Sequence, residues 1–128
     1  MGYIRLELKG SDVADRMLAR VENVPGLARE ALQAGADVLL PVEQAHAPVL
    51  HPGGPHIKSR LAIKIKGGGS KMTAHVGVWD EPIAYYVERG HGGPHPAPAH
   101  PYMEPAAEEA EDAVLDAITQ TIADQLGL

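Results

Sequence analysis

The segment LAIKIKGGGSKMTAHVGV, residues 61–78, has the clearest secondary-structure pattern in this chain of 128 residues. Apolar residues alternate with polar ones over Leu61–Lys66, and apolar residues again occupy every second position from Met72 to Val78. A period of two is typical of strands with one buried face. The glycine-rich run between the two halves is suited to a turn. The segment therefore predicts an antiparallel hairpin with a flexible tip.

The residues before the hairpin predict one more strand and a short helix. Ile4, Leu6 and Leu8 alternate with charged residues, which is again the period of a strand. The Gly-Ser pair that follows ends this strand, and Ser11 can cap a short helix that runs to about Val21. We expect the strand to join the hairpin in a small antiparallel sheet.

A longer central helix should follow, with Pro25 in its first turn. Apolar residues recur there at steps of three and four, which gives one face of small side chains. Pro41 has no backbone donor, so a kink or a break is expected between Val38 and Pro41, and Pro48 ends the helix. The apolar face consists of Leu27, Ala31, Ala34, Val38 and Val42.

A closing helix is predicted with Pro105 in its first turn and an end near Leu126. Acidic residues crowd its first turns, where the helix dipole favours negative charge: Glu104, Glu108, Glu109, Glu111 and Asp112. Its buried stripe is expected to contain Val114, Ala117, Ile118, Thr121 and Leu126, widened by Leu115 and Ile122. Together the elements predict one α+β domain, residues 1–128, with the sheet packed against the long central helix and the C-terminal helix.

The composition bounds both the core and the partners. Phe is absent and aromatic residues make up 4%, so the core must be built from small aliphatic side chains, and such a light core often depends on neighbouring subunits. Lys and Arg number 11 against 17 Asp and Glu, a net charge of −6. This balance argues against a protein that binds duplex DNA tightly, because Lys and Arg side chains supply most of the non-specific affinity for DNA phosphates. It permits a channel wall past which DNA slides as cargo.

Several further classes are disfavoured by what the sequence lacks. There is no cysteine, so disulfides, a thiol nucleophile and a cysteine-based zinc site are excluded. The amino terminus has no continuous apolar run like that of a signal peptide. No segment approaches the roughly 18 to 20 apolar residues of a membrane span. We therefore expect a chain without a membrane partner.

Two short runs in the second half resemble a known family. The first is Tyr85-Tyr86-Val87-Glu88-Arg89-Gly90, and the second is Pro101-Tyr102-Met103-Glu104-Pro105-Ala106. Together with the Ala-rich helix, Ala47-Pro48-Val49 and the hairpin, their order over residues 25–110 resembles the tail-completion or neck proteins of long-tailed bacteriophages, the gene-product-ten family of lambdoid phages. Members typically read Tyr-Ala-x-Tyr-Val-Glu-x-Gly-Thr and later Pro-Phe-Leu-x-Pro-Ala. In this chain His91 stands for the usual Thr and Tyr102 for the usual Phe, and residues 51–61 diverge from the family pattern.

The resemblance implies a structural protein rather than an enzyme, with no cofactor. Such proteins act late in virion assembly, in the neck between the portal and the tail tube. They usually form a homo-oligomeric ring, here expected to be a hexamer or dodecamer, assembled in the cytoplasm of a bacterial host. Its neighbours would be the connector or stopper above and the tail terminator or tail tube below.

The expected contact residues fall into two groups. Within the family-like runs, Tyr85 and Val87 can be buried while Tyr86 and Glu88 project, Gly90 supplies a turn, and the ring of Tyr102 enters the core while its hydroxyl reaches a partner. The interface group is Tyr85, Tyr86, Glu88, Gly90, Pro101, Tyr102 and Pro105. The candidates for contacts between adjacent rings are Gly67, Gly68, Gly69, Ser70 and Lys71 of the hairpin tip, and His51, His56, His91 and His95 of the loops.

The histidine-rich loops support an alternative, a small metal-binding or hydrolytic domain. The tetrapeptide Gly-Gly-Pro-His occurs twice, and His56, His91, His95 and His100 could offer nitrogens to zinc if the loops meet. The prolines and glycines around them prevent the helical frame that such ligands usually have. The simpler interpretation is that these histidines face solvent or an interface. If they face Glu88 or Glu104 of a neighbour, assembly should weaken at high pH, because the histidines lose their positive charge.

Other chemistry finds little support. No serine lies in a Gly-x-Ser-x-Gly elbow. Gly67–Lys71 lacks the order of a phosphate-binding loop and joins two strands. The acidic residues of the closing helix are typical of a solvated face. A toxin-like or adaptor domain that binds proteins outside a virion is a third possibility.

Overall fold

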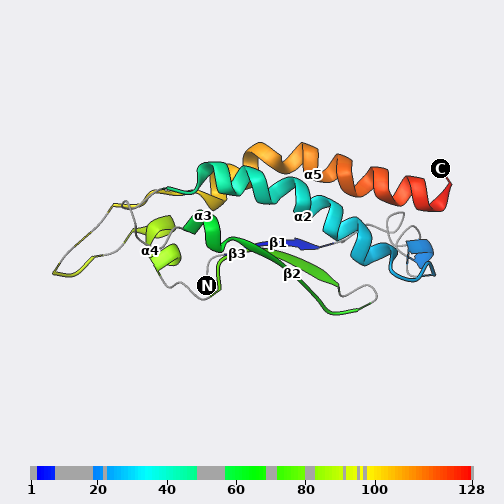
Figure 1. Cartoon of the computed structure of the whole chain (residues 1–128), viewed down its shortest axis with the longest axis horizontal. Coiled ribbons are helices and arrows are strands. Elements are labelled where there is room, and N and C mark those ends of the chain that lie inside the picture. The colour runs from blue at the N-terminus through cyan, green and yellow to red at the C-terminus, as the bar shows by residue number, and fades with distance from the viewer. Residues whose placement is uncertain are drawn as a thin grey trace.

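The computed structural model describes residues 3–7, 19–21, 23–48, 57–68, 72–79, 83–90, 92–94, 96 and 98–127. The elements follow one another as β1 (Tyr3–Glu7), α2 (Leu27–His46), α3 (Ile57–Arg60), β2 (Ala62–Lys66), β3 (Thr73–Gly77), α4 (Ile83–Arg89) and α5 (Met103–Leu126). Figure 1 shows the long helices α2 and α5 side by side, with the sheet on one side of them. The α+β class and the predicted packing of the sheet against both helices are confirmed.

The sheet has three strands in the order β1-β3-β2, and both pairs are antiparallel. Val76 of β3 lies between Ile4 and Ile63, and Ala74 lies between Leu6 and Ile65. These rows are apolar because alternation places every second side chain on the same face. The predicted hairpin and the predicted N-terminal strand are both confirmed.

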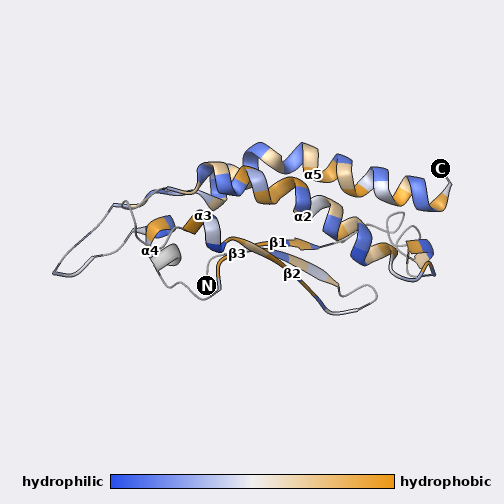
Figure 2. Cartoon of the chain, in the orientation of Figure 1, coloured by the Kyte–Doolittle hydropathy of each residue, from blue (hydrophilic) through white to orange (hydrophobic). Residues whose placement is uncertain are grey.

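The core lies between the inner face of the sheet and the two helices. Its buried members come from α2, β3 and α5: Leu32, Ala36, Leu39, Ala74, Val76, Ala110 and Val114. Figure 2 shows the hydrophobic colours concentrated along the facing sides of these elements. A second cluster near the other end contains Ala47, Ile57, Leu61, Val78, Val87 and Tyr102. Ala36, Ala74 and Ala110 of the first cluster are small, which lets the layers approach closely there.

Helices α2 and α5 run antiparallel. His46, the last residue of α2, lies 3.0 Å from Glu109 near the start of α5, and Gln125 near the end of α5 donates to Glu30 at 3.4 Å. Gly35 makes the crossing possible, since a Cβ there would lie 2.9 Å from Ile118. Because glycine has no side chain, Ile118 of α5 can occupy the space next to Gly35.

The central helix differs from the prediction in three respects. It begins at Leu27, after Gly26 with a φ of 78°, so Pro25 precedes the helix instead of lying in its first turn. It continues without a break through Pro41, which is exposed and costs one backbone bond. Leu27 and Ala31 of the predicted face are buried, but beyond them the buried face is rotated: Leu32, Gly35, Ala36, Leu39 and Glu43 are buried, whereas Ala34, Val38 and Val42 are half-buried.

The closing helix has the predicted limits, with Pro105 in its first turn, and Gly127 ends it with a φ of 72°. Its buried face is shorter than predicted, since only Ala106, Ala110 and Val114 are buried. Leu115 was expected to widen the buried stripe, but 55% of its surface is exposed. The helix has a single neighbour along much of its length, α2, so one narrow strip is enough to hold it.

The described residues bear on two further expectations, the short N-terminal helix and the absence of a membrane span. Residues 19–21 are helical, which fits the end of the predicted helix from Ser11, and the rest of that helix lies outside the described residues. No helix in the part of the chain that the structure describes is long and apolar enough to cross a membrane.

Candidate functional site

The two family-like runs meet at the amino end of α5. Glu88 of α4 turns its carboxylate onto this end: Oε2 accepts the backbone N–H groups of Tyr102 at 2.6 Å and Met103 at 3.0 Å, and Oε1 accepts that of Glu104 at 3.1 Å. The first N–H groups of a helix have no partner within it, and the dipole favours negative charge there. Glu88 therefore caps α5 from a different helix.

The backbone around α4 supports this junction. The N–H of His100 donates to the carbonyl of Val87 at 2.7 Å, which ties the segment before α5 to α4. Gly90 has a φ of 75°, a left-handed conformation that favours glycine, and its N–H donates to the carbonyl of Tyr86. The predicted turn at Gly90 is confirmed.

The side chains of this junction separate into inner and outer ones. Val87 is buried and Tyr86 is 49% exposed, as predicted. Glu88 does not project: it is half-buried against α5. Pro101 is exposed and Pro105 is half-buried. In the sequence they flank the three residues whose N–H groups Glu88 caps. The side chain of Tyr85 lies outside the described part of the structure.

Beneath the cap lies a pair of buried polar groups, Tyr102 and Glu43. The ring of Tyr102 is fully buried, as predicted, but within the described part of the chain its hydroxyl has no hydrogen-bond partner, which corrects the expectation of one. Glu43, on the inner face of α2, is also fully buried, and both of its carboxyl oxygens lack a described partner. One acid and one phenol therefore share one end of the core.

The protonation of this group follows from its surroundings. Burial, followed by the nearby charge of Glu88, raises the pKa of Glu43 from 4.5 to about 8. Burial, followed by the charges of Glu43 and Glu88, raises the pKa of Tyr102 as well. Glu43 is therefore mostly protonated at pH 7.

Sequence reasoning missed Glu43. Its position four residues after Leu39 and seven after Ala36, both buried, places it on the same face of the helix. That spacing was the available signal. The polar nature of the residue, at a place where such a face is normally apolar, concealed it.

The outer face of the sheet carries a row of rings. Tyr3 stacks on His75 with centroids 4.5 Å apart and lies 6.2 Å from the ring of Trp79, and the Lys64 ammonium lies 4.4 Å from the Trp79 ring. Tyr3 is thus stacked with both His75 and Trp79. Burial, followed by Lys66 and Arg5, lowers the pKa of His75. We therefore interpret this row as a set of contacts that stabilises the sheet, and not as a surface on which nucleic-acid bases stack.

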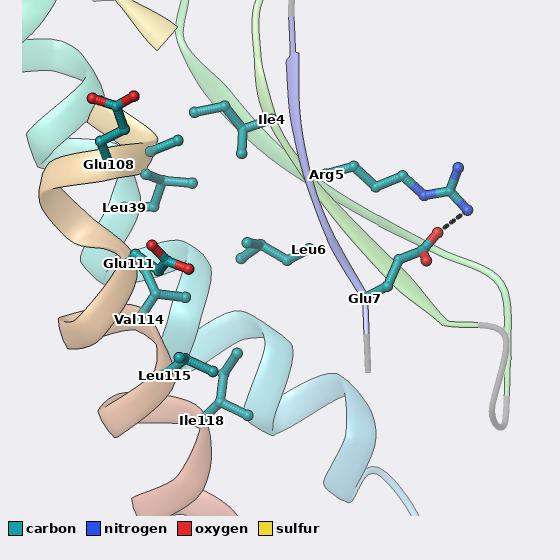
Figure 3. Close-up of a pocket in the computed structure, with 11 residues that line it drawn as sticks. Ile4, Arg5, Leu6, Glu7, Leu39, Glu108, Glu111, Val114, Leu115 and Ile118 are labelled. Carbon is teal, nitrogen blue, oxygen red and sulfur yellow. Dashed lines mark ion pairs between the residues drawn. The ribbon is translucent and has the colours of Figure 1, made fainter. Parts of the chain in front are cut away.

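Between β1 and α5 lies an apolar groove of about 430 Å³. Ile4 and Leu6 form one wall, Val114, Leu115 and Ile118 the other, and Leu39 of α2 lies at its base (Figure 3). Glu108 and Glu111 stand along the α5 rim, while Arg5 and Glu7 of β1 form an ion pair that points away from α5. The groove lies beside an outer strand of the sheet.

Charge is segregated between two segments of the sequence. Residues 57–79 contain Lys58, Arg60, Lys64, Lys66 and Lys71 and no acid. Helix α5 contains no Lys or Arg and is acidic throughout: Glu104, Glu108, Glu109, Glu111, Asp112, Asp116 and Asp124. The chain therefore has a basic hairpin and an acidic closing helix.

The remaining predicted site residues are only partly visible. His51, His56, His91 and His95 lie outside the described residues, as do Gly69, Ser70 and Lys71 of the tip. Gly67 and Gly68 form the described start of the tip, and His100 is exposed near the cap. Across the described ranges, no three His, Asp or Glu side chains gather so that they could hold a metal ion.

Comparison with protein-family models, curated proteins and solved structures finds no match for this chain.

Proposed function

We propose that the chain is a structural component of a bacteriophage neck that forms a homo-oligomeric ring and joins the tail to the DNA-filled head. In this role it contacts the connector or stopper on one side and the tail terminator or tail tube on the other. DNA passes through the lumen as cargo. The protein acts in the virion and catalyses no reaction.

The observation that carries the proposal is the junction at Glu88. The two runs that resemble the neck-protein family are separated by residues 91–100, yet one carboxylate joins them with three hydrogen bonds. Glu and Gly of the first run supply the cap and the turn, and the second run supplies the helix end that is capped. The residues that carry the resemblance thus form one structural unit, which supports the family interpretation.

The surface properties support an assembling role. The groove between β1 and α5 leaves aliphatic side chains in contact with solvent, and Leu115 is 55% exposed. Neighbouring copies in a ring would cover such a surface. The acidic closing helix would repel the phosphates of passing DNA if it faced the lumen.

A joining assay tests the proposal. In a phage that carries this gene, deleting the gene should leave filled heads and complete tails as separate particles in electron micrographs. The wild-type protein added to the mixed lysate should restore joined, infectious particles. Joined virions in the absence of the gene would contradict the proposal. Stoichiometric zinc in the purified protein would favour the alternative of a metal-binding domain.

A further inference from the structure

The outer face of the sheet is basic and is exposed to solvent. The two long helices pack on the inner face. On the outer face, Arg5 of β1 and Lys64 of β2 both lie opposite His75 of β3, and Lys66 lies one row further along. All three cations are exposed. Glu7 is the one acid on this face of the described strands, and it is paired with Arg5. The face therefore has an excess of positive charge.

The surroundings of His75 reflect this excess. His75 is buried and stacks on Tyr3, whose ring is 42% exposed. Burial, followed by the charges of Lys66 and Arg5, lowers the pKa of His75, and the opposing effect of Glu7 is smaller. An acidic partner is therefore favoured at this face. The exposed side chains make up the basic face: Tyr3, Arg5, Lys64 and Lys66.

Helix α5 has a side that matches the basic face. Glu104, Glu108 and Asp112 follow one another at steps of four, so they lie along one side of the helix at intervals of about 6 Å. All three are exposed, and Leu115, seven residues after Glu108, lies on the same side. Alternate residues of a strand are roughly 6.6 Å apart, so acids one turn apart can meet cations in successive rows. These four residues of α5 make up the acidic stripe.

The two surfaces lie on opposite sides of the molecule. Helix α5 lies on the inner side of the sheet, whereas the basic face points away from both long helices (Figure 1). The acidic stripe and the basic face therefore cannot meet within one copy. Two copies can place the stripe of one on the face of the other, and that contact leaves one stripe and one face free.

Apolar exposure also matches between the two surfaces. Tyr3 and Leu115 are exposed large hydrophobic residues, at 42% and 55%. Tyr3 belongs to the basic face and Leu115 to the acidic stripe, so one contact would remove both from water. A nucleic acid could neutralise the basic face, but it would leave Leu115 exposed. A second copy of the chain therefore fits both surfaces better.

We propose that the acidic stripe of α5 docks on the basic face of a second copy of the chain. The carboxylates of one copy then lie against the cations of the next. Because the contact joins two different surfaces, it can repeat from copy to copy and close into a ring. This inference rests on the proposed function, because it specifies the contact between copies of the ring.

Charge reversal on each side of the contact provides the first test. The stripe variant is Glu108→Lys/Asp112→Lys, and the face variant is Lys64→Glu/Lys66→Glu; all four side chains are exposed, so both variants should fold. The measurement is the mass in solution by light scattering after size exclusion, over a range of concentrations. Each variant alone sets like charges against one another, so it should associate about a hundredfold or more weakly than the wild type.

A matched control and an uncharged substitution complete this series. Asp116→Lys/Asp124→Lys makes the same change of charge on α5 at exposed positions rotated by roughly 80° and 160° from Glu108, and should keep the wild-type mass. Leu115→Gln removes apolar contact without changing charge, and should weaken association about tenfold. An unchanged circular dichroism spectrum verifies that each variant is folded.

Mixing distinguishes this contact from other modes of association. The stripe variant keeps the basic face and the face variant keeps the acidic stripe, so one wild-type contact can form between them. The other contact joins a reversed stripe to a reversed face, so its charges are again opposite. An equimolar mixture should therefore regain oligomers in which the two variants alternate. The variant that combines all four substitutions should assemble alone.

Crosslinking locates the contact directly. The chain contains no cysteine, so single cysteines can be introduced without side reactions. Asp112→Cys mixed with Lys64→Cys and a short bis-maleimide reagent should give a covalent dimer that contains one copy of each. Asp124→Cys mixed with Lys64→Cys is the control, and should give no such dimer.

The outcomes separate the inference from the proposed function. Oligomers whose mass neither charge variant alters, a mixture that stays monomeric, or a wild type that is monomeric at every concentration would overturn the inference, while the joining assay would still decide the neck role. Duplex DNA that binds the wild type and not the face variant, with an unaltered mass, would assign the basic face to nucleic acid and also overturn it. If the contact is confirmed and joining does not require the gene, the neck role fails alone.

Discussion

Glu88 belongs to α4, Tyr102 directly precedes α5, and Oε2 of Glu88 accepts the backbone N–H of Tyr102 at 2.6 Å. This bond fixes the place at which α5 begins, although no side chain of α5 itself caps that end. The position of α5 against α2 therefore depends on a residue outside both helices.

Replacing Glu88 by Ala should lower the free energy of unfolding by about 2 kcal/mol, because three backbone N–H groups lose a charged acceptor. Urea denaturation measures the loss. Glu104→Ala is the control: Glu104 is an exposed acid in the same first turn, and its removal should cost no more than about 1 kcal/mol. Equal losses for the two variants would mean that the cap contributes nothing specific.

The stability of the protein should fall as the pH rises from about 4.5 to about 8, because of Glu43. In this window the unfolded chain releases the proton and the folded chain keeps it, so the folded state binds more protons and loses stability with increasing pH. The full pKa shift corresponds to a loss on the order of 5 kcal/mol. Denaturation curves of the wild type and Glu43→Gln at about pH 5 and pH 8.5 measure it. A glutamine variant with the same pH dependence as the wild type would show that Glu43 is not the cause.

Tyr102→Phe should leave the protein as stable as the wild type or make it more stable by about 1 kcal/mol, since the buried hydroxyl has no partner among the described residues. Thermal melting detects the change. A clear loss of stability in Tyr102→Phe would reveal a hydrogen bond to the hydroxyl.

Gly35→Leu should destabilise the protein by about 2 kcal/mol, because its side chain would enter the space that Ile118 and Val114 occupy. Combining it with Ile118→Ala should recover part of the loss, since the smaller side chain makes room. A double-mutant cycle in urea measures this coupling. Additive losses would show that α2 and α5 move apart instead of competing for one space.

Proline at Gly68 and Gly69 should block the joining of heads and tails without changing the fold. Gly68 has open space around it, so a larger residue there meets no neighbour within 4 Å. Gly68→Ala is the control, since it keeps the backbone donor and should join normally. Joining at the wild-type level by the proline variant would remove the tip from the contact surface.

The elements with a strict period were predictable from the sequence. The alternation over Leu61–Lys66 and in the N-terminal strand determines which side of each strand is buried, so both were located correctly. The limits of α5 were also predicted, with Pro105 in its first turn and an end near Leu126. In these segments the local sequence pattern was enough to locate the element.

The parts that failed depend on contacts between distant segments. Beyond Ala31 the buried face of α2 was misplaced, because many of its small residues could face inward and only packing against β3 and α5 selects Leu32, Leu39 and Glu43. Leu115 was placed in the core because its neighbours in sequence belong there, yet no helix covers it in the described structure. The bond from Glu88 to α5 spans 14 residues and two elements, so no periodicity could indicate it.

The separation of basic residues in the hairpin from acidic residues in α5 makes each molecule an electric dipole. Two such molecules approaching in solution rotate into alignment before they touch, so encounters become productive more often and salt slows them by screening. This separation of charge also makes the two sides of the molecule different, with the basic hairpin on one side and the acidic α5 on the other. In the proposed ring, copies that follow one another head to tail would have two free ends while the ring is open and none once it is closed, so closure would remove the surface at which growth continues.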